Sequence, residues 1–427
     1  MGPVEIVSVT RADDAGGELL GFELEAPEPG GGDEPVVPVR GWVLGAASPA
    51  ASVEITQGRQ VLWQQPLSPR GDVSRMHRDV PPGTRAGFDA ALGVLGLEED
   101  FELTVSAVLE DGSRVALATV RGRRERLSPP PPGSLRPVRV TCLHRSGSTW
   151  LMHLLATHPE IVAVRAYPYE SAAARYWAHA LKVLTEPAAP DVGPRASEPR
   201  RVGHNPYYKD AVRAEPGLAR WYAREYVEDL VSLCRRSAES WYRLVAEGQG
   251  KDRVSFFAEK HILQPGEARE VWNELYPGGS EVLLVRDFRD VVFSGISFDR
   301  SHGHRRFGDR PGEPYEPYIR RVLARAERLC EIWPGRGDVH LVRYEDLIAE
   351  PRETLAALLA HIGVAASTET VAGVLQEARE PIAGGRRHVT APSVEESVGR
   401  WRAEADDSFR ALCYELLAQP LRAFGYA

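Results

Sequence analysis

The sequence predicts a two-domain α/β protein in which an all-β sandwich precedes a domain built on a parallel sheet. Three observations support this. Short β-rich segments separated by glycines and prolines fill the first 126 residues, four consecutive prolines follow at Pro129–Pro132, and strands alternate with helices from residue 138. A length of 427 residues also favours two domains over one. We therefore expect domains at residues 1–126 and 138–427, joined by a stiff linker at residues 127–137.

The first domain is expected to form an immunoglobulin-like sandwich of about eight strands. Phe101–Val105 alternates apolar and polar residues, as a half-buried strand does. Asp111-Gly112 lies between two β-rich segments and predicts a hairpin turn. The expected strands are Val4–Val9, Leu19–Glu25, Val36–Leu44, Ser52–Gln57, Gln60–Trp63, Gly87–Leu92, Phe101–Val108 and Arg114–Thr119.

The second domain begins with an apolar segment, Val138–Leu143, which predicts a buried strand. A polar loop follows, and then a helix that ends at His158-Pro159. Residues 171–250 are expected to be largely helical, and Pro351 is expected to begin a later helix that Gly363 ends. Further buried strands are expected at Phe256–Glu259, Val282–Val285 and Val339–Val342.

Composition and charge argue against some classes of function. The formal net charge of −8 gives no reason to expect nucleic-acid binding. No apolar run approaches the roughly 20 residues that a membrane helix needs. The start of the chain lacks the features of a signal peptide, and its four cysteines form no metal-type pairs. We therefore expect a cytoplasmic protein; the sequence does not indicate an oligomeric state.

The loop after Val138–Leu143 has the character of an anion-binding site. Free backbone N–H groups and the dipole at a helix start favour an anion, and Gly147 permits close approach of the backbone. Ser146, Ser148 and Thr149 add hydroxyl donors, and Arg145 adds a permanent charge. The structural alternative is a capped helix after a tight turn. The loop is not a Walker A sequence, because no Gly-Lys-Ser/Thr follows.

The run from Arg145 to Trp150 resembles the 5′-phosphosulfate-binding loop of sulfotransferases, in which Lys or Arg precedes Ser-Gly-Thr-Thr. These enzymes transfer a sulfuryl group from 3′-phosphoadenosine 5′-phosphosulfate (PAPS). The resemblance implies that Trp150 contacts the adenine; the alternative is a core tryptophan.

A second segment resembles the 3′-phosphate anchor of the same family, which uses an Arg after a strand and a Ser eight residues later. Arg286 and Ser294 have this separation. Arg offers a bidentate, charge-assisted contact and Ser a directed hydroxyl. Phe288 departs from the usual proline. Without the upstream loop, Arg286-Asp287 and Arg289-Asp290 would be interpreted as surface ion pairs.

Two later segments extend the resemblance to residues 138–403. Tyr344 begins a Tyr-Glu-Asp-Leu run whose Tyr lies near the adenine in some members, although it is equally well explained as a strand end. Ser397, Arg400 and Arg402 lie in a segment that resembles the part closing over the cofactor. The basic residues usual just upstream are replaced by Val394–Glu396, so any phosphate contact is expected from these three side chains.

The resemblance also indicates catalytic residues and a reaction without a metal. Transfer needs a cation near the bridging oxygen and a base for the acceptor. Lys260 is the candidate cation, because Ala258–Leu263 resembles the family's Lys-Thr-His-Leu segment. His261 is one position out of register for the family's histidine, which places it on the opposite strand face. Glu170 is the preferred candidate base; the alternative is a surface glutamate.

Two further stretches carry weaker hypotheses. A basic loop (Arg300, His302, His304, Arg305, Arg306 and Arg310) is either solvated or a contact for an anionic group, and Val202–Tyr207 is a candidate lining of the acceptor pocket.

Alternative functions are a P-loop kinase for a small molecule, or a glycan- or protein-binding protein with an inactive transferase scaffold. The acceptor stays open between a small molecule and a glycan, at a hydroxyl or an amine.

Overall fold

The computed structural model describes residues 4–13, 17–32, 35–77, 80–187, 215–263, 269–303, 314–333, 339–380, 391 and 393–426. The chain divides into two compact units. The first contains Met1–Pro129, Trp177–Arg235 and Ala268–Leu275, and the second contains the remainder of the chain. The division therefore falls within two helices, α3 (Ala173–Thr185) and α6 (Val227–Gly248). The domain limits expected from the sequence stay a prediction.

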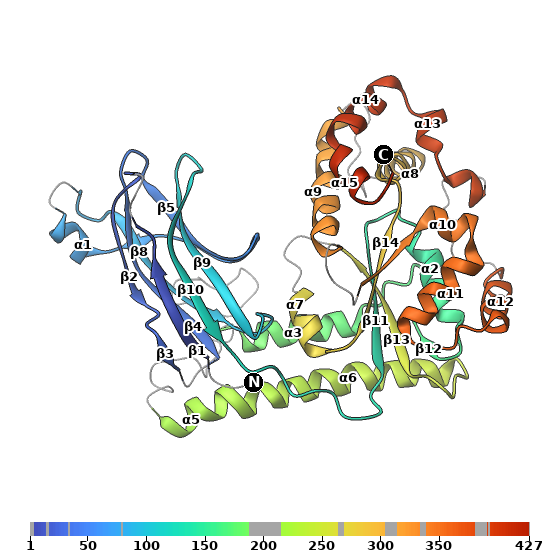
Figure 1. Ribbon diagram of the computed structural model, residues 1–427, viewed down its shortest axis with the longest axis horizontal. Helices are drawn as coiled ribbons and strands as arrows, with labels where there is room; N and C mark the ends of the chain where they lie inside the picture. The colour runs from blue at the N-terminus through green and yellow to red at the C-terminus, as the bar shows by residue number, and fades with distance from the viewer. Residues whose placement is uncertain are drawn as a thin grey trace. The chain divides into compact units, whose positions relative to one another are not determined.

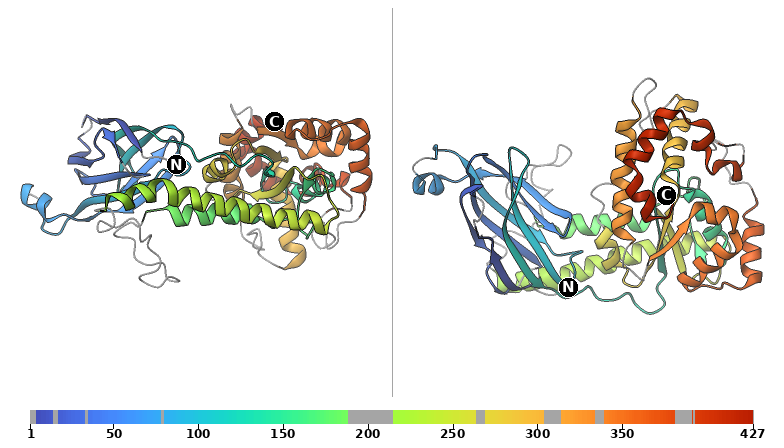
Figure 2. Two further views of the ribbon diagram at one scale, coloured as in Figure 1. Left: turned by 90° about the horizontal axis from the view of Figure 1, so that it is seen from below. Right: turned by 45° about the horizontal axis from the view of Figure 1, so that its top comes forward.

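The first unit contains two antiparallel sheets that form the sandwich (Figures 1 and 2). One has the order β3-β1-β10-β9-β5-β6 and the other β2-β4-β8-β7. All eight expected strands are confirmed, whereas the two-residue strands β3 and β7 are too short to leave a sequence pattern. The strands are β1 (Glu5–Arg11), β2 (Leu19–Ala26), β3 (Gly30–Gly31), β4 (Val36–Gly45), β5 (Ala50–Gln57), β6 (Gln60–Pro66), β7 (Ser68–Pro69), β8 (Arg85–Gly93), β9 (Asp100–Leu109) and β10 (Arg114–Arg123).

The predicted hairpin joins β9 to β10. Gly112 has φ 86°, a left-handed conformation that favours glycine, and Asp111 accepts a hydrogen bond from the Ser113 N–H at 2.9 Å. Phe101, Leu103 and Val105 are buried along β9, as their alternation predicts. The remaining helices of this unit are α1 (Gly71–Met76), α5 (Pro216–Trp221), the π-helix Tyr222–Tyr226 and α7 (Arg269–Leu275).

The second unit is built on a five-stranded parallel sheet with the order β12-β13-β11-β14-β15. Its strands are β11 (Arg136–Cys142), β12 (Ile161–Val162), β13 (Phe256–Ile262), β14 (Ser280–Val285) and β15 (Val339–Arg343). Because β11 lies between β13 and β14, the loops that follow these three strands emerge side by side at one edge of the sheet. This arrangement confirms the strands expected from the apolar segments.

Helices cover both faces of this sheet. They are α2 (Ser148–Thr157), α8 (Phe288–His302), α9 (Glu316–Ile332), α10 (Tyr344–Ala349), α11 (Pro351–Ile362), α12 (Thr368–Glu377), the 3₁₀ helix Glu395–Ser397, α13 (Arg400–Glu404), α14 (Asp407–Leu416) and α15 (Ala418–Ala423). Strand β14 shows the two layers directly. Val282 and Leu284 pack with α2, α11 and α12, whereas Leu283 and Val285 pack with α8, α9 and α14.

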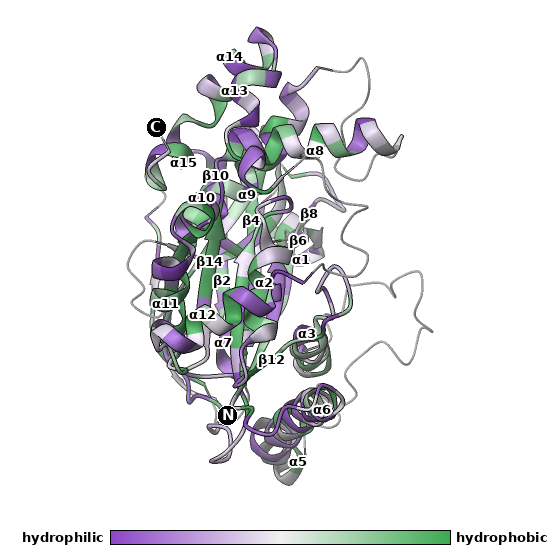
Figure 3. Cartoon of the chain, turned by 90° about the vertical axis from the view of Figure 1, so that its right-hand side faces the viewer, coloured by the Kyte–Doolittle hydropathy of each residue, from purple (hydrophilic) through white to green (hydrophobic). Residues whose placement is uncertain are grey.

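The hydropathy of the chain follows this layering. Figure 3 shows hydrophobic colour concentrated in strands such as β14, with hydrophilic residues on the outer turns of the helices around them. As predicted, Pro351 begins α11, and Gly363 caps the end of α11 in a left-handed conformation with φ 84°. Within the described ranges, no helix is long and apolar enough to cross a membrane.

Candidate functional site

The loop between β11 and α2 is tightly bent and held from within. Ser146 is buried, and its hydroxyl donates to the Leu143 carbonyl at 2.7 Å. Gly147 caps α2 with φ 85°, and a Cβ atom at this position would lie 2.1 Å from Cδ2 of Tyr344. Only glycine fits here, because both the backbone conformation and the neighbouring ring exclude a side chain. Ser148 and Thr149 occupy the first positions of α2.

The two predicted phosphate anchors meet in the structure. Arg286 follows β14 directly, and its Nη1 donates to the Arg145 carbonyl at 3.1 Å. Nε of Arg145 in turn donates to Oγ of Ser294, on α8, at 3.0 Å. Segments far apart in the sequence thus form one group, with Arg286 and Ser294 buried beside the loop. We call Arg145, Arg286 and Ser294 the arginine clamp.

The arginine clamp concentrates positive charge in a buried place. Burial, followed by the charge of Arg286, lowers the pKa of Arg145. Arg286 is only 6% exposed, and its Nε has no hydrogen-bond acceptor among the described residues. Two nearby guanidinium groups repel each other, and a buried donor without a partner is unfavourable. An anion bound between them would relieve both effects.

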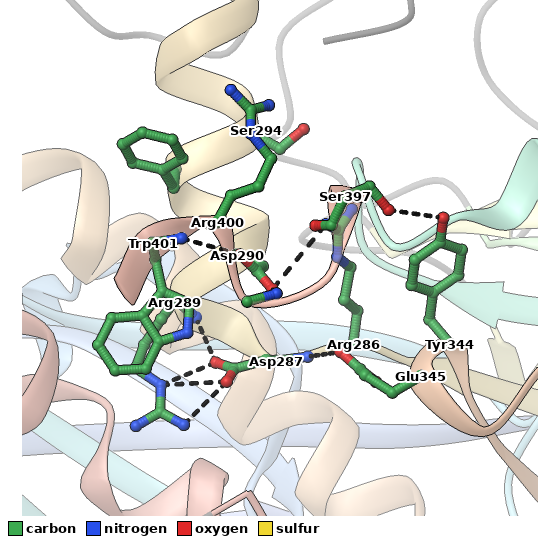
Figure 4. A network of polar contacts seen from close by, with 12 residues as sticks. Arg286, Asp287, Arg289, Asp290, Ser294, Tyr344, Glu345, Ser397, Arg400 and Trp401 are labelled. Atoms are coloured by element: carbon green, nitrogen blue, oxygen red, sulfur yellow. Dashed lines mark hydrogen bonds and ion pairs between the residues drawn. The ribbon is translucent and has the colours of Figure 1, made fainter. Parts of the chain in front are cut away.

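Tyr344 and Ser397 complete the surroundings of Arg286. The guanidinium carbon of Arg286 lies 4.8 Å from the centre of the Tyr344 ring. The Tyr344 hydroxyl and Oγ of Ser397 are 3.0 Å apart, and the Ser397 carbonyl accepts a hydrogen bond from Nη2 of Arg286 (Figure 4). Burial raises the pKa of Tyr344, so its phenol stays protonated at neutral pH. Both residues had been predicted to lie at the cofactor site.

Asp290, which is not among the predicted site residues, lies between Arg286 and Trp401 (Figure 4). Its carboxylate accepts hydrogen bonds from the backbone N–H groups of Gly399, at 2.6 Å, and Trp401, at 3.2 Å. One Oδ2–Nη2 distance to Arg286 is 4.0 Å. Its hydrogen-bond partners are backbone N–H groups, so no residue-type pattern in the sequence marks it.

Three further cofactor candidates have different neighbours from one another: Arg400, Arg402 and Trp150. Nε of Arg400 donates to Glu404 at 2.7 Å, and its guanidinium lies over the ring of Phe293. Arg402 lines a pocket of about 500 Å³ together with Arg289, Trp401, Tyr414, Ala418, Leu421, Arg422 and Tyr426. Trp150 is partly buried against the core and lies 5.9 Å from the ring of His153.

The two preferred catalytic candidates form an ion pair. Nζ of Lys260 lies 2.8 Å from Oε1 of Glu170 and donates to the Pro168 carbonyl at 2.7 Å. The Lys260 side chain is buried, whereas that of Glu170 is 39% exposed. The segment before Glu170 is fixed to α2, because the Tyr169 hydroxyl lies 2.8 Å from Nδ1 of His153.

His261 lies on the opposite face of β13 from Lys260, as strand alternation requires. Its Nε2 is 3.3 Å from Oε2 of Glu259. Glu259 also accepts hydrogen bonds from the backbone N–H groups of Ala174 and Arg175 at the start of α3, and from the Tyr242 hydroxyl. The contact of His261 with Glu259 is thus a contact with a buried group that supports the fold.

The other candidate residues lie largely outside the described part of the chain. These are His304, Arg305, Arg306, Arg310 and Val202–Tyr207. Arg300, on α8, donates to the Tyr315 hydroxyl at 3.4 Å, and His302 is the last residue of the same helix. In the part of the chain that the structure describes, no group of three His, Cys, Asp or Glu side chains is placed to hold a metal ion.

Comparisons with known proteins show the family of the chain. A model of the sulfotransferase family matches residues 137–368. The chain is similar to the solved sulfotransferase domain from the curacin biosynthetic pathway, with a TM-score of 0.36 and 14% identity over 68% of this chain and 99% of that one. It is also similar to a mouse sulfotransferase complexed with PAP, with a TM-score of 0.35 and 11% identity over 67% and 84% of the two chains. No curated protein sequence matches the chain.

Proposed function

The chain belongs to the sulfotransferase family, and from this premise we propose that it transfers the sulfuryl group of PAPS to a hydroxyl or amine of a small-molecule or glycan acceptor. PAPS supplies an activated sulfuryl group on its 5′-phosphate and carries a second phosphate at the 3′ position. The hydrogen-bond donors at the site suit a nucleotide with two separate anionic groups.

The observation that carries the proposal is the contact between the two predicted anchors through Arg145. The guanidinium of Arg286 donates to the backbone carbonyl of Arg145, and the guanidinium of Arg145 donates to the hydroxyl of Ser294. The buried Nε of Arg286, which has no acceptor among the described residues, offers a further donor to an anion. We assign the 3′-phosphate to Arg286 and Ser294, with Ser397 beside them, since a bidentate arginine contact and a hydroxyl together suit a phosphate.

The 5′ group is assigned to the loop and the first turn of α2. Backbone N–H groups at a helix start point toward a bound anion, and the hydroxyls of Ser148 and Thr149 lie in that turn. Trp150 and Tyr344 are the assigned neighbours of the adenine. Arg400 and Arg402 are assigned weaker roles, since Arg400 is paired with Glu404 and Arg402 faces the separate pocket.

The Lys260–Glu170 pair is assigned the chemistry of transfer. In this scheme the Glu170 carboxylate removes the proton from the acceptor group as the acceptor's oxygen or nitrogen forms its bond to sulfur. The bond between sulfur and the bridging oxygen breaks, and Lys260 stabilises the charge that develops on that oxygen. The ion pair at 2.8 Å supports this, because it places the buried ammonium of Lys260 beside the partly exposed carboxylate of Glu170. His261 has no part in the scheme, since it faces Glu259.

Calorimetric titration with adenosine 3′,5′-bisphosphate (PAP) tests the assignment of Arg286. Arg286→Ala should weaken binding by a factor of about 30 or more, since truncating one partner of a buried charge pair costs roughly 2–5 kcal/mol. Arg352→Ala, which removes an exposed arginine from α11, is the control and should leave the Kd unchanged. Equal affinity of the wild type and Arg286→Ala would contradict the proposed donor site.

A further inference from the structure

Asp290 is the most deeply buried charged group next to the arginine clamp. It is 1% exposed, and it accepts two backbone hydrogen bonds from a segment that lies more than a hundred residues later in the chain. A buried carboxylate is unfavourable unless it is hydrogen-bonded or paired. The N–H groups of Gly399 and Trp401, together with Arg286, supply these partners. The carboxylate therefore fixes the turn at Gly399–Trp401 against α8.

This turn is continuous with the residue that contacts Arg286. Ser397 lies two residues before Gly399; its carbonyl accepts a hydrogen bond from Arg286, and its hydroxyl contacts Tyr344. Asp290 lies in the first turn of α8, and Arg286 precedes that helix; Oδ2 of Asp290 lies 4.0 Å from Nη2 of Arg286. One carboxylate thus contacts both the segment that carries Ser397 and the arginine assigned to the 3′-phosphate.

We propose that Asp290 is a positioning residue that fixes Arg286 and the Ser397–Trp401 segment in the arrangement that recognises the 3′-phosphate of the donor. This inference rests on the proposed function. Asp290 touches no reacting atom, and it acts through Arg286 and Ser397. Its main effect falls on the 3′ end of the nucleotide, because Asp290 contacts Arg286 and the Gly399–Trp401 turn directly, whereas it reaches the loop assigned to the 5′ group only through Arg286.

Two effects of the Asp290 charge oppose each other. The carboxylate repels a phosphate bound to Arg286, but it also orients Arg286 and holds Ser397 in place. Asn has one acceptor oxygen and one NH₂ group, so Asp290→Asn would face two N–H donors with a single acceptor and lose at least one hydrogen bond. Bonds to a charged acceptor are among the strong ones, and we therefore expect the loss of orientation to outweigh the relief of repulsion.

The test compares PAP with adenosine 5′-monophosphate, which lacks the 3′-phosphate. Calorimetry gives the Kd of both ligands for the full chain, and the quantity of interest is the preference, Kd of the monophosphate divided by Kd of PAP. Asp290→Asn should lower this preference about tenfold or more, while the Kd of the monophosphate changes little. A structural defect alone would weaken both ligands equally and leave the preference unchanged.

Glu345→Gln is the matched control. Glu345 is a partly buried carboxylate nearby, but it accepts from the Asp287 N–H at 3.0 Å and the Tyr426 hydroxyl at 2.6 Å. Its substitution should lower the temperature of unfolding and keep the preference for PAP. An unchanged or increased preference in Asp290→Asn would overturn the positioning role. Absence of any preference in the wild type would instead overturn the proposed function.

If Asp290→Asn does not fold, a second variant tests the same proposal. Tyr344→Phe removes only the hydroxyl that contacts Ser397 at 3.0 Å, which is another side-chain contact that holds the same segment. A lowered preference for PAP in this variant supports positioning by the docked segment. A preference equal to that of the wild type contradicts it.

Discussion

The contact between Gly147 and Tyr344 gives a prediction whose size follows from the structure. In Gly147→Ala the new Cβ would lie 2.1 Å from Cδ2 and 2.3 Å from Cε2 of Tyr344, far inside van der Waals contact. The ring is buried, carries Arg286 on its face and contacts Ser397, so it cannot move without disturbing both. We expect Gly147→Ala to lower both the stability of the fold and the affinity for PAP.

Two terms add up in this variant. A residue with a Cβ in the left-handed conformation costs roughly 1–2 kcal/mol, and overpacking of a buried site typically costs about 1–3 kcal/mol. Gly363→Ala separates them, because Gly363 has φ 84° against 85° for Gly147 but has nothing within 4 Å of the added Cβ. The control therefore carries the backbone cost alone.

The assay is urea denaturation of both variants and the wild type, followed by PAP titration. Gly147→Ala should unfold with a free energy about 1–3 kcal/mol below that of Gly363→Ala and should bind PAP more weakly, whereas Gly363→Ala should bind like the wild type. If the two variants have equal free energies of unfolding and equal affinities, the close approach of Tyr344 to the loop is wrong.

Two further predictions concern catalysis and pH. Glu170→Gln should reduce turnover by a factor of about 100 or more, the usual share of a general base, while Glu170→Asp should retain more of it; near-normal turnover in both would exclude Glu170 as the base. His158 is fully buried, donates through Nε2 to the Ala365 carbonyl at 2.9 Å and accepts the Glu160 N–H at Nδ1, so only the neutral ring satisfies both contacts. Burial lowers the pKa of His158, so the unfolded chain binds a proton at this residue more readily than the folded chain does. The contribution of His158 to stability is therefore complete above pH 6.5 and falls as the pH drops below that value. NMR titration of the His158 imidazole should give a pKa below 6.5. A value above 6.5 would contradict the prediction, because His158 would then stabilise the fold more at low pH than at high pH.

Much of the fold could be predicted because its signals are local. Alternation in Phe101–Val105, the Asp111-Gly112 turn and the apolar segment leading into Arg286 each specify their element without reference to the rest of the chain. The two-residue strands β3 and β7 could not be predicted, since they exist only through pairing with their neighbours.

The grouping of α7 with the sandwich also depends on distant contacts. Glu274 of α7 forms a buried ion pair with Arg124 and accepts the Gly96 N–H at 2.6 Å. Nothing in the sequence around Glu274 distinguishes it from an exposed glutamate. Its burial can be inferred only once the structure shows its partner, Arg124.

The site also contains features with a local sequence signal and features that depend on distant contacts. Motif spacing predicted Arg145, Arg286 and Ser294, and the structure brings them into contact. That Lys260 and Glu170 form a pair was not predicted, because their segments are separated by the helices α3 and α6. Asp290 was missed for a similar reason, since its partners are backbone N–H groups, which carry no residue-type signal.

The most direct test of the central claim is a thermal-unfolding titration of the wild type with PAP beside ATP–Mg²⁺. A ligand that binds only the native state stabilises it by mass action, by about 2.7 kcal/mol at one hundred times its Kd. We predict that the unfolding temperature rises with PAP concentration and that PAP does so at lower concentration than ATP–Mg²⁺. Stabilisation by ATP–Mg²⁺ without stabilisation by PAP would contradict a donor site for PAPS.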